Sequence, residues 1–77
     1  MSNKVMIYSK AGCGECVFTK KYLDQNGVDY QEFNLTQEPQ YLQTVTDLGF
    51  SSLPVVVIEG QEAFSGFQPQ RLETLVG

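Results

Sequence analysis

Residues 5–16 read VMIYSKAGCGEC, a short apolar run followed by a turn and a close pair of cysteines. The run at 5–8 is apolar at every position, as in a central strand that is buried on both faces of a sheet. Helical spacing follows from 14 to 26 and places Cys16, Thr19 and Leu23 on one face. This stretch therefore predicts a strand, a turn and a helix that begins at the cysteine pair.

The position of the two cysteines at a helix start favours thiol–disulfide chemistry. The first N–H groups of a helix are unpaired and the helix dipole is positive there, so both favour a thiolate at Cys13. A thiol with a pKa of about 8.5 is roughly 7% ionised at about pH 7.4, whereas a pKa of about 7 gives roughly 70%. Residues so close on a first turn can also form a disulfide. We therefore predict that Cys13 attacks and that Cys16 resolves the mixed disulfide.

Two structural roles for the cysteines compete with this prediction. A structural disulfide here would close a ring of four residues, which contributes only about 2 kcal/mol of chain entropy, well below a long-range bridge. A structural zinc site needs four ligands, and the chain has two cysteines and no histidine. Redox chemistry is the better interpretation, because it suits a cysteine pair in a strand–turn–helix setting.

Length, charge and the N-terminal residues narrow the class of protein. Seventy-seven residues predict one domain over residues 1–77. The net charge of −4 argues against nucleic acid as a partner, because phosphate binding needs clustered Lys and Arg. The apolar run at 5–8 is too short for a signal peptide or a membrane span. We therefore expect a cytoplasmic monomer without membrane contact, and in the reducing cytosol a close cysteine pair is more often catalytic than structural.

The rest of the chain predicts alternating strands and helices. Further strands are expected at 30–35, 55–58 and 61–64, and further helices from about 36 to 48 and from 69 to 76. Thr36 is the expected cap of the middle helix, whose apolar positions are Leu42, Val45 and Leu48. The order βαβαββα predicts an α/β protein with a four-stranded mixed sheet flanked by helices, in which the last two strands form an antiparallel hairpin.

Three segments are candidates for binding a substrate. Lys10 is the cation nearest to the cysteines in sequence, and it either supports the thiolate or a substrate carboxylate, or is an ordinary solvated lysine. Pro54 precedes a buried strand, and a cis bond from Leu53 would expose the Leu53 backbone to a peptide, although trans is the commoner form. Ser65-Gly66 either lets a substrate backbone approach closely or is a plain turn.

Glu15 and three aromatic residues lie near these segments in the expected fold. The Glu15 carboxylate would oppose thiolate formation if it approached the Cys13 sulfur, and we expect it to point to solvent instead. Tyr8, Phe64 and Phe67 either form an exposed apolar rim or belong to the core, and in so small a protein the core is favoured.

Four segments carry a family resemblance. They are Ile7-Tyr8-Ser9-Lys10, Cys13-Gly14-Glu15-Cys16, Leu53-Pro54-Val55-Val56 and Phe64-Ser65-Gly66-Phe67-Gln68-Pro69. With them the chain resembles the thioredoxin-fold family, and within it the NrdH-type redoxins, over nearly its whole length. That family typically carries Trp-Ser-Gly-Phe-Arg-Pro-Asp in the last segment. Phe64, Gln68 and Gln70 depart from it, and the two glutamines can form only neutral hydrogen bonds where an Arg and an Asp could pair.

The resemblance implies a thioredoxin-like fold and a role for each candidate residue. Cys13 would be the nucleophile and Cys16 the resolving thiol, while Leu53, a cis Pro54 and Ser65-Gly66 would line the substrate groove. Electrons would pass from thioredoxin reductase to a disulfide of ribonucleotide reductase. No cofactor would be bound beyond the redox-active disulfide itself, and the sequence carries no Gly-rich dinucleotide fingerprint.

Other functions remain open beside this one. Glutathione-dependent glutaredoxins resemble the chain, but they usually carry a Gly-Gly-x-Asp-Asp-like turn that grips the amino end of glutathione, and residues 65–69 contain no acid. A binding module with idle thiols, or a dimer that bridges an iron–sulfur cluster through Cys13, belongs to a different class of function.

Overall fold

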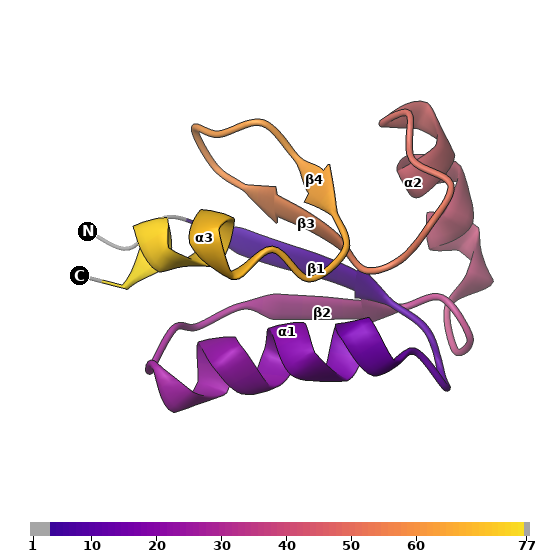
Figure 1. The fold of residues 1–77 in the computed structure, drawn as a ribbon. Helices are drawn as coiled ribbons and strands as arrows, with labels where there is room; N and C mark the ends of the chain where they lie inside the picture. Colours follow the sequence, from indigo (N-terminus) through magenta and orange to yellow (C-terminus); the bar gives the residue numbers. More distant parts are fainter. Residues whose placement is uncertain (1–3, 77) are drawn as a thin grey trace.

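The order of strands and helices along the chain is the predicted βαβαββα, in a computed structural model that describes residues 4–76 (Figure 1). The strands are β1 (Val5–Ser9), β2 (Gln31–Asn34), β3 (Val55–Ile58) and β4 (Phe64–Ser65). The helices are α1 (Gly14–Gln25), α2 (Leu42–Asp47) and α3 (Pro69–Leu72). Two 3-10 turns adjoin them: η1 (Pro39–Tyr41) leads into α2, and η2 (Glu73–Leu75) follows α3.

The four strands form one mixed sheet in the order β2-β1-β3-β4. β1 runs parallel to β2, and Tyr8 lies opposite Phe33 in that pair. β3 is antiparallel to both of its neighbours, with Val56 opposite Ile7 on one side and opposite Phe64 on the other. The parallel β1–β2 pair needs a crossover, which α1 supplies. The turn between β1 and α1, which contains Cys13, is therefore at the carboxyl end of a central strand.

Each face of the sheet has its own apolar cluster, because successive side chains of β1 and β3 point to opposite faces. The cluster on the first face contains Val5, Ile7, Leu23, Val56, Ile58, Phe64 and Leu72. The cluster on the second face contains Tyr8, Val45 and Val55, with Phe33, Tyr41 and Leu53 among the residues packed against it. Helices α1 and α3 therefore cover the first face, and α2 covers the second (Figure 1).

Helix α1 follows its predicted course. Its buried side chains are Cys16, Thr19 and Leu23, the three residues that the helical spacing places on one face. The chain leaves the helix at Gly27, whose φ of 68° is in the left-handed region that favours glycine. This turn lets the N–H of Val28 donate to the carbonyl of Leu23 at 2.9 Å, as at many helix ends. No helix between residues 4 and 76 is long and apolar enough to cross a membrane.

The segment before α2 corrects two predictions. The N-cap of η1 is Glu38 and that of α2 is Tyr41, and neither makes a side-chain capping bond, so the prediction that Thr36 caps this helix is wrong. The Thr36 hydroxyl oxygen instead accepts a hydrogen bond from the N–H of Ala11 at 3.0 Å, which ties the turn after β1 to the segment after β2. On α2 only Val45 of the predicted apolar face is buried, whereas Leu42 is 57% exposed.

The return strand of the final hairpin is shorter than predicted. β4 contains only Phe64 and Ser65, although the sequence predicted a strand over 61–64. The Glu62 carbonyl accepts a hydrogen bond from Nη2 of Arg71 at 2.8 Å, so this part of the chain turns toward α3 rather than pairing with β3. Glu62 and Ala63 also have low strand propensity.

Candidate active site

The two cysteines are joined by a disulfide at the first turn of α1. Cys13 is the N-cap residue of the helix and Cys16 lies in its first turn, with the two Cα atoms 5.2 Å apart. Sγ of Cys13 accepts a hydrogen bond from the backbone N–H of Cys16 at 3.2 Å. The Cys16 side chain is only 1% exposed, whereas Cys13 is partly exposed. A molecule that approaches the disulfide from solvent therefore meets the Cys13 sulfur first.

The N-cap position gives the Cys13 sulfur a favourable electrostatic setting. Helix N-caps are usually Ser, Thr, Asp or Asn, whose oxygen accepts an N–H of the first turn, and here a sulfur takes that place. A hydrogen bond to a charged acceptor is stronger than one to a neutral acceptor. Reduction of the disulfide therefore leaves a sulfur that the helix start stabilises more as an anion than as a thiol.

The Leu53–Pro54 segment and Ser65-Gly66 lie side by side next to the cysteines. The Leu53–Pro54 bond is cis, and the Leu53 carbonyl oxygen is 3.7 Å from Sγ of Cys13. The N–H of Gly66 donates to the Pro54 carbonyl at 2.9 Å, and Gly66 has a φ of 82° that favours glycine. The structure thus brings the predicted residues Cys13, Leu53, Pro54, Ser65 and Gly66 into one place.

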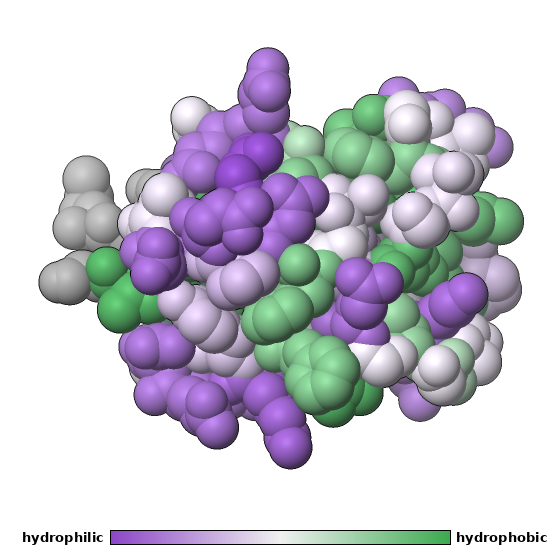
Figure 2. Space-filling model, viewed as in Figure 1, coloured by the Kyte–Doolittle hydropathy of each residue, from purple (hydrophilic) through white to green (hydrophobic). Residues whose placement is uncertain are grey.

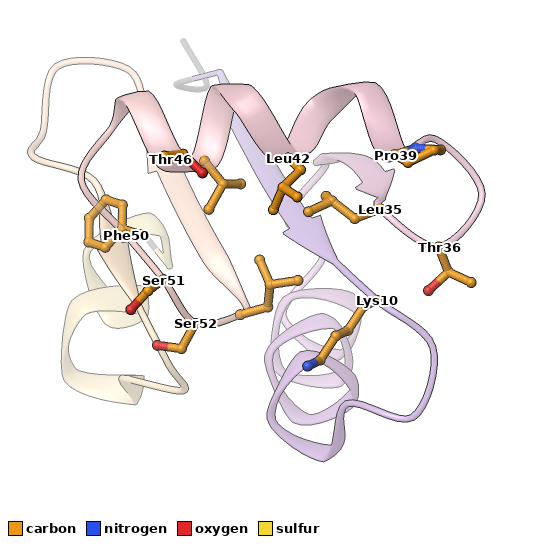
Figure 3. Close-up of a pocket in the computed structure, with 11 residues that line it drawn as sticks. Lys10, Leu35, Thr36, Pro39, Leu42, Thr46, Phe50, Ser51 and Ser52 are labelled. Carbon is orange, nitrogen blue, oxygen red and sulfur yellow. The ribbon is translucent and has the colours of Figure 1, made fainter.

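Lys10 is the residue that follows β1. It lines a pocket of about 560 Å³ whose apolar side chains come largely from η1, α2 and the segments next to them, such as Leu35, Leu42 and Phe50. Figure 3 shows Lys10 and Thr36 at one end of this pocket and Phe50, Ser51 and Ser52 at the other. Of the predicted binding residues, Lys10 and Leu53 line this pocket, and the Leu53 carbonyl also lies beside the Cys13 sulfur.

Glu15 is exposed, as expected, but its carboxylate also makes a contact that the sequence did not predict. Oε1 of Glu15 accepts a hydrogen bond from the backbone N–H of Phe67 at 3.1 Å. A Cβ atom built on Gly66 would lie 3.4 Å from the same oxygen. The Glu15 carboxylate is thus held at the loop that contains Ser65-Gly66, and sequence spacing gives no signal for it because the two partners are 52 residues apart.

The aromatic residues divide between core and surface. Tyr8 and Phe64 are 6% and 4% exposed, so the favoured assignment to the core holds for both. Phe67 is partly buried, and its ring centroid lies 6.1 Å from that of Phe18. Phe18 itself is 58% exposed and its neighbour Val17 is 48% exposed, and the hydrophobic colour over α1 in Figure 2 marks this apolar surface. Neither residue is among the site residues predicted from the sequence, because the helical spacing marks only the buried face of α1.

The positions that depart from the family signature form local contacts. Nε2 of Gln68 donates to the Ser65 carbonyl at 2.8 Å, so this glutamine makes a neutral hydrogen bond within its own loop. Gln70 is exposed. The Arg71 guanidinium lies over the ring of Phe64, 4.6 Å from its centroid. The loop from Ser65 to Gln68 is therefore braced by its own side chains as well as by Glu15.

A charged cluster supports the sheet below the active-site turn. The hydroxyl of Ser9, the last residue of β1, donates to Oε2 of Glu32 at 2.5 Å, and Nζ of Lys20 lies 2.7 Å from the same oxygen. Burial alone would raise the pKa of the Glu32 carboxyl, but the hydrogen bonds from Lys20 and Ser9 and the Lys20 charge outweigh it and hold this pKa below its usual range. Burial and the neighbouring Tyr41 raise the pKa of Tyr8.

Comparison with known proteins identifies the family. The glutaredoxin family model matches residues 5–63. The glutaredoxin-like protein NrdH of Lactococcus lactis subsp. cremoris is 35% identical over 71 residues, which are 92% of this chain and 97% of that protein. The chain belongs to the NrdH-type redoxins of the glutaredoxin family. It is therefore a thiol–disulfide oxidoreductase with a redox-active cysteine pair.

Two further proteins are similar to the chain over most of its length. The Gene 56 protein of Mycobacterium phage D29 is 34% identical over 77 residues, covering 99% of this chain and 86% of the phage protein. The solved structure of NrdH-redoxin from Escherichia coli superimposes with a TM-score of 0.85 at 30% identity, covering 94% of this chain and 93% of that one. The predicted thioredoxin-like fold is thereby confirmed.

Proposed function

We propose that this chain is a dithiol electron carrier that accepts electrons from thioredoxin reductase and passes them to a disulfide of ribonucleotide reductase. The observation that carries the proposal is the geometry of the cysteine pair. The partly exposed Cys13 sulfur accepts the N–H of Cys16 at 3.2 Å, and the Cys16 sulfur is buried next to it. One sulfur is thus accessible and stabilised as an anion, while the second is within bonding reach of the first.

The reaction has two exchange steps. The Cys13 thiolate attacks one sulfur of the substrate disulfide, the substrate S–S bond breaks, and its second sulfur leaves as a thiolate that takes up a proton. Cys16, as a thiolate after losing its proton, then attacks the Cys13 sulfur and expels the first substrate sulfur as another thiol. Two electrons pass to the substrate and the Cys13–Cys16 disulfide forms. Thioredoxin reductase then supplies two electrons, and with two protons the Cys13–Cys16 disulfide returns to two thiols.

The choice of donor rests on the loop after β4 and on one relative. Residues 65–69 hold no acid that could pair with the ammonium of glutathione, and the carboxylate of Glu15 already occupies the N–H of Phe67. The absence of an acid within residues 65–69 disfavours glutathione as the reductant. The Escherichia coli NrdH-redoxin is a glutaredoxin-like protein with a thioredoxin-like activity profile, which supports thioredoxin reductase as the donor here as well.

The carrier needs no bound flavin or nicotinamide in this scheme, since the cysteine pair itself stores the two electrons. One chain supplies Cys13, Cys16, Leu53 and Gly66, so the carrier acts as a monomer. We place it in the cytoplasm, where thiols are kept reduced.

Separate supply of the two candidate donors tests this function. The oxidised protein would be mixed with NADPH and thioredoxin reductase, or with NADPH, glutathione and glutathione reductase, and NADPH consumption would be followed with oxidised ribonucleotide reductase as acceptor. We expect sustained turnover with thioredoxin reductase and at least about tenfold slower turnover with glutathione. The Cys13→Ser variant is the control and should show none with either donor. Faster turnover with glutathione would make the chain a glutathione-dependent glutaredoxin.

The order of attack is tested by trapping. A Cys16→Ser variant lacks the resolving sulfur. It should therefore accumulate a mixed disulfide between Cys13 and the subunit of ribonucleotide reductase that carries the substrate disulfide. A matched Cys13→Ser variant should trap little, because its remaining sulfur is buried. Equal trapping by both variants would contradict the assigned roles.

A further inference from the structure

Glu15 links the helix of the active site to the loop after β4. Its backbone lies in the first turn of α1, between Cys13 and Cys16, and its side chain reaches the N–H of Phe67 at 3.1 Å. The same loop is bound on its other side, where the N–H of Gly66 donates to the Pro54 carbonyl at 2.9 Å. The loop therefore has one anchor on α1 and one on the segment before β3.

A second contact between α1 and the loop is apolar and lies further along the helix. The Phe67 ring packs against Phe18 and Tyr22, with centroid distances of 6.1 and 6.4 Å. These ring contacts involve the side chain of Phe67 and not its backbone N–H. The Glu15 carboxylate acts on the backbone directly, because it accepts the N–H of Phe67.

We propose that Glu15 is a positioning residue that fixes the Ser65–Phe67 loop relative to the Cys13 sulfur, and so sets the affinity for a peptide disulfide. The inference rests on the proposed function in one respect, that the substrate chain passes between Leu53–Pro54 and this loop. Glu15 does not touch the reacting sulfur in this role. Its removal should therefore weaken protein-substrate binding and leave the exchange chemistry at Cys13 almost unchanged.

The hydrogen bond and the charge of Glu15 can be separated by two variants. Glu15→Gln keeps an oxygen that can accept the N–H of Phe67 but removes the negative charge, whereas Glu15→Ala removes both. Glu59→Ala is a matched control, because Glu59 is an exposed glutamate in the turn after β3, at the end of that strand away from Pro54. Each variant would be assayed with dithiothreitol as the reductant, so that the result does not depend on which reductase is the natural donor.

The first readout is the affinity for a protein disulfide, measured as KM with insulin, beside the rate with a small disulfide such as hydroxyethyl disulfide. Loss of the hydrogen bond in Glu15→Ala should raise KM for insulin about three- to tenfold with little change in kcat. The small disulfide should react at the wild-type rate, because it does not reach the loop. Glu15→Gln and Glu59→Ala should stay within about twofold of wild type in both assays.

The second readout is hydrogen exchange at the Phe67 amide, which reports the contact without any substrate. Exchange should be faster in Glu15→Ala and close to wild type in Glu15→Gln. Equal exchange in all variants, equal KM for insulin in all variants, or an equal KM change in Glu15→Gln and Glu15→Ala would each overturn the inference. Failure of thioredoxin reductase as donor, with dithiothreitol still supporting turnover, would instead contradict the proposed function alone.

Discussion

At the scale of single residues, the first turn of α1 combines two tasks. The N–H that the Cys13 sulfur accepts belongs to Cys16, so the residue with the second sulfur also stabilises the first through its backbone. This arrangement follows from the spacing of the pair, because an N-cap side chain bonds the N–H three residues later. The two cysteines could be assigned from sequence for the same reason, since their relation is local.

The ionisation of Cys13 is the direct test at this scale. In the reduced Cys16→Ser variant, which retains the backbone N–H, the rate of alkylation by iodoacetamide should rise with pH through a midpoint below the ordinary cysteine pKa of about 8.5. The same variant unfolded in urea is the control and should give a midpoint near that ordinary value. Equal midpoints in the folded and unfolded protein would mean that the helix start does not favour the thiolate.

Glu15 shows where residue-level prediction from the sequence ends. Its contact with Phe67 joins positions that only the complete fold brings together. Thr36 was misjudged for the same reason, since its hydroxyl serves Ala11 on another segment rather than its own helix. Capping and spacing rules describe residues that are close along the chain, whereas Phe67 is far from Glu15 in sequence and Ala11 is far from Thr36.

At the scale of elements, the segments that were predicted well have strong apolar patterns. β1 and β3 are buried on both faces, and α1 has an uninterrupted buried stripe, so burial fixes their extent. The α2 region and β4 are short and partly exposed, and Leu42 and Leu48 remain exposed although their spacing is helical. For such elements, contacts with adjacent segments of the same chain decide where the helix or strand begins and ends.

The cluster of Ser9, Lys20 and Glu32 connects β1, α1 and β2, and its contribution should depend on pH. The pKa of Glu32 in the folded state lies below its usual value of 4.5, so this stabilisation is complete above pH 4.5 and is lost as the pH falls through the folded-state pKa. At about pH 7 the Glu32→Gln variant should lose about 0.5–1.5 kcal/mol in free energy of unfolding.

Urea unfolding at several pH values measures this difference. The gap between wild type and Glu32→Gln should narrow as the pH falls below 4.5, because the wild-type carboxylate then becomes protonated. Glu38→Gln is a suitable control, since Glu38 makes no side-chain capping bond. A gap that stays constant at low pH would show that the ionised form of Glu32 is not what stabilises the protein.

At the scale of the whole molecule, two apolar clusters on opposite faces of the sheet hold the fold together. The disulfide closes only a short ring at the edge of the sheet, between residues separated by three positions. The reduced protein should therefore stay folded, with a free energy of unfolding that differs from the oxidised form by about 2 kcal/mol or less.

Urea unfolding of the oxidised and the dithiothreitol-reduced protein, followed by near-ultraviolet circular dichroism, checks this expectation. A Cys13→Ser, Cys16→Ser double variant separates the effect of the bond from that of the reductant, and it should unfold close to the reduced form. Loss of the near-ultraviolet signal on reduction in the absence of urea would mean that the disulfide is structural.

The burial of Cys16 limits how the molecule meets its partners. A protein that delivers electrons and a protein that receives them must both approach the same small area around Cys13, because the other sulfur has no surface of its own. The two partners therefore compete for this surface and bind one after the other. A large excess of either one slows the overall electron transfer, because it blocks binding of the other. The rate of electron transfer through such a carrier depends on how quickly each partner protein dissociates.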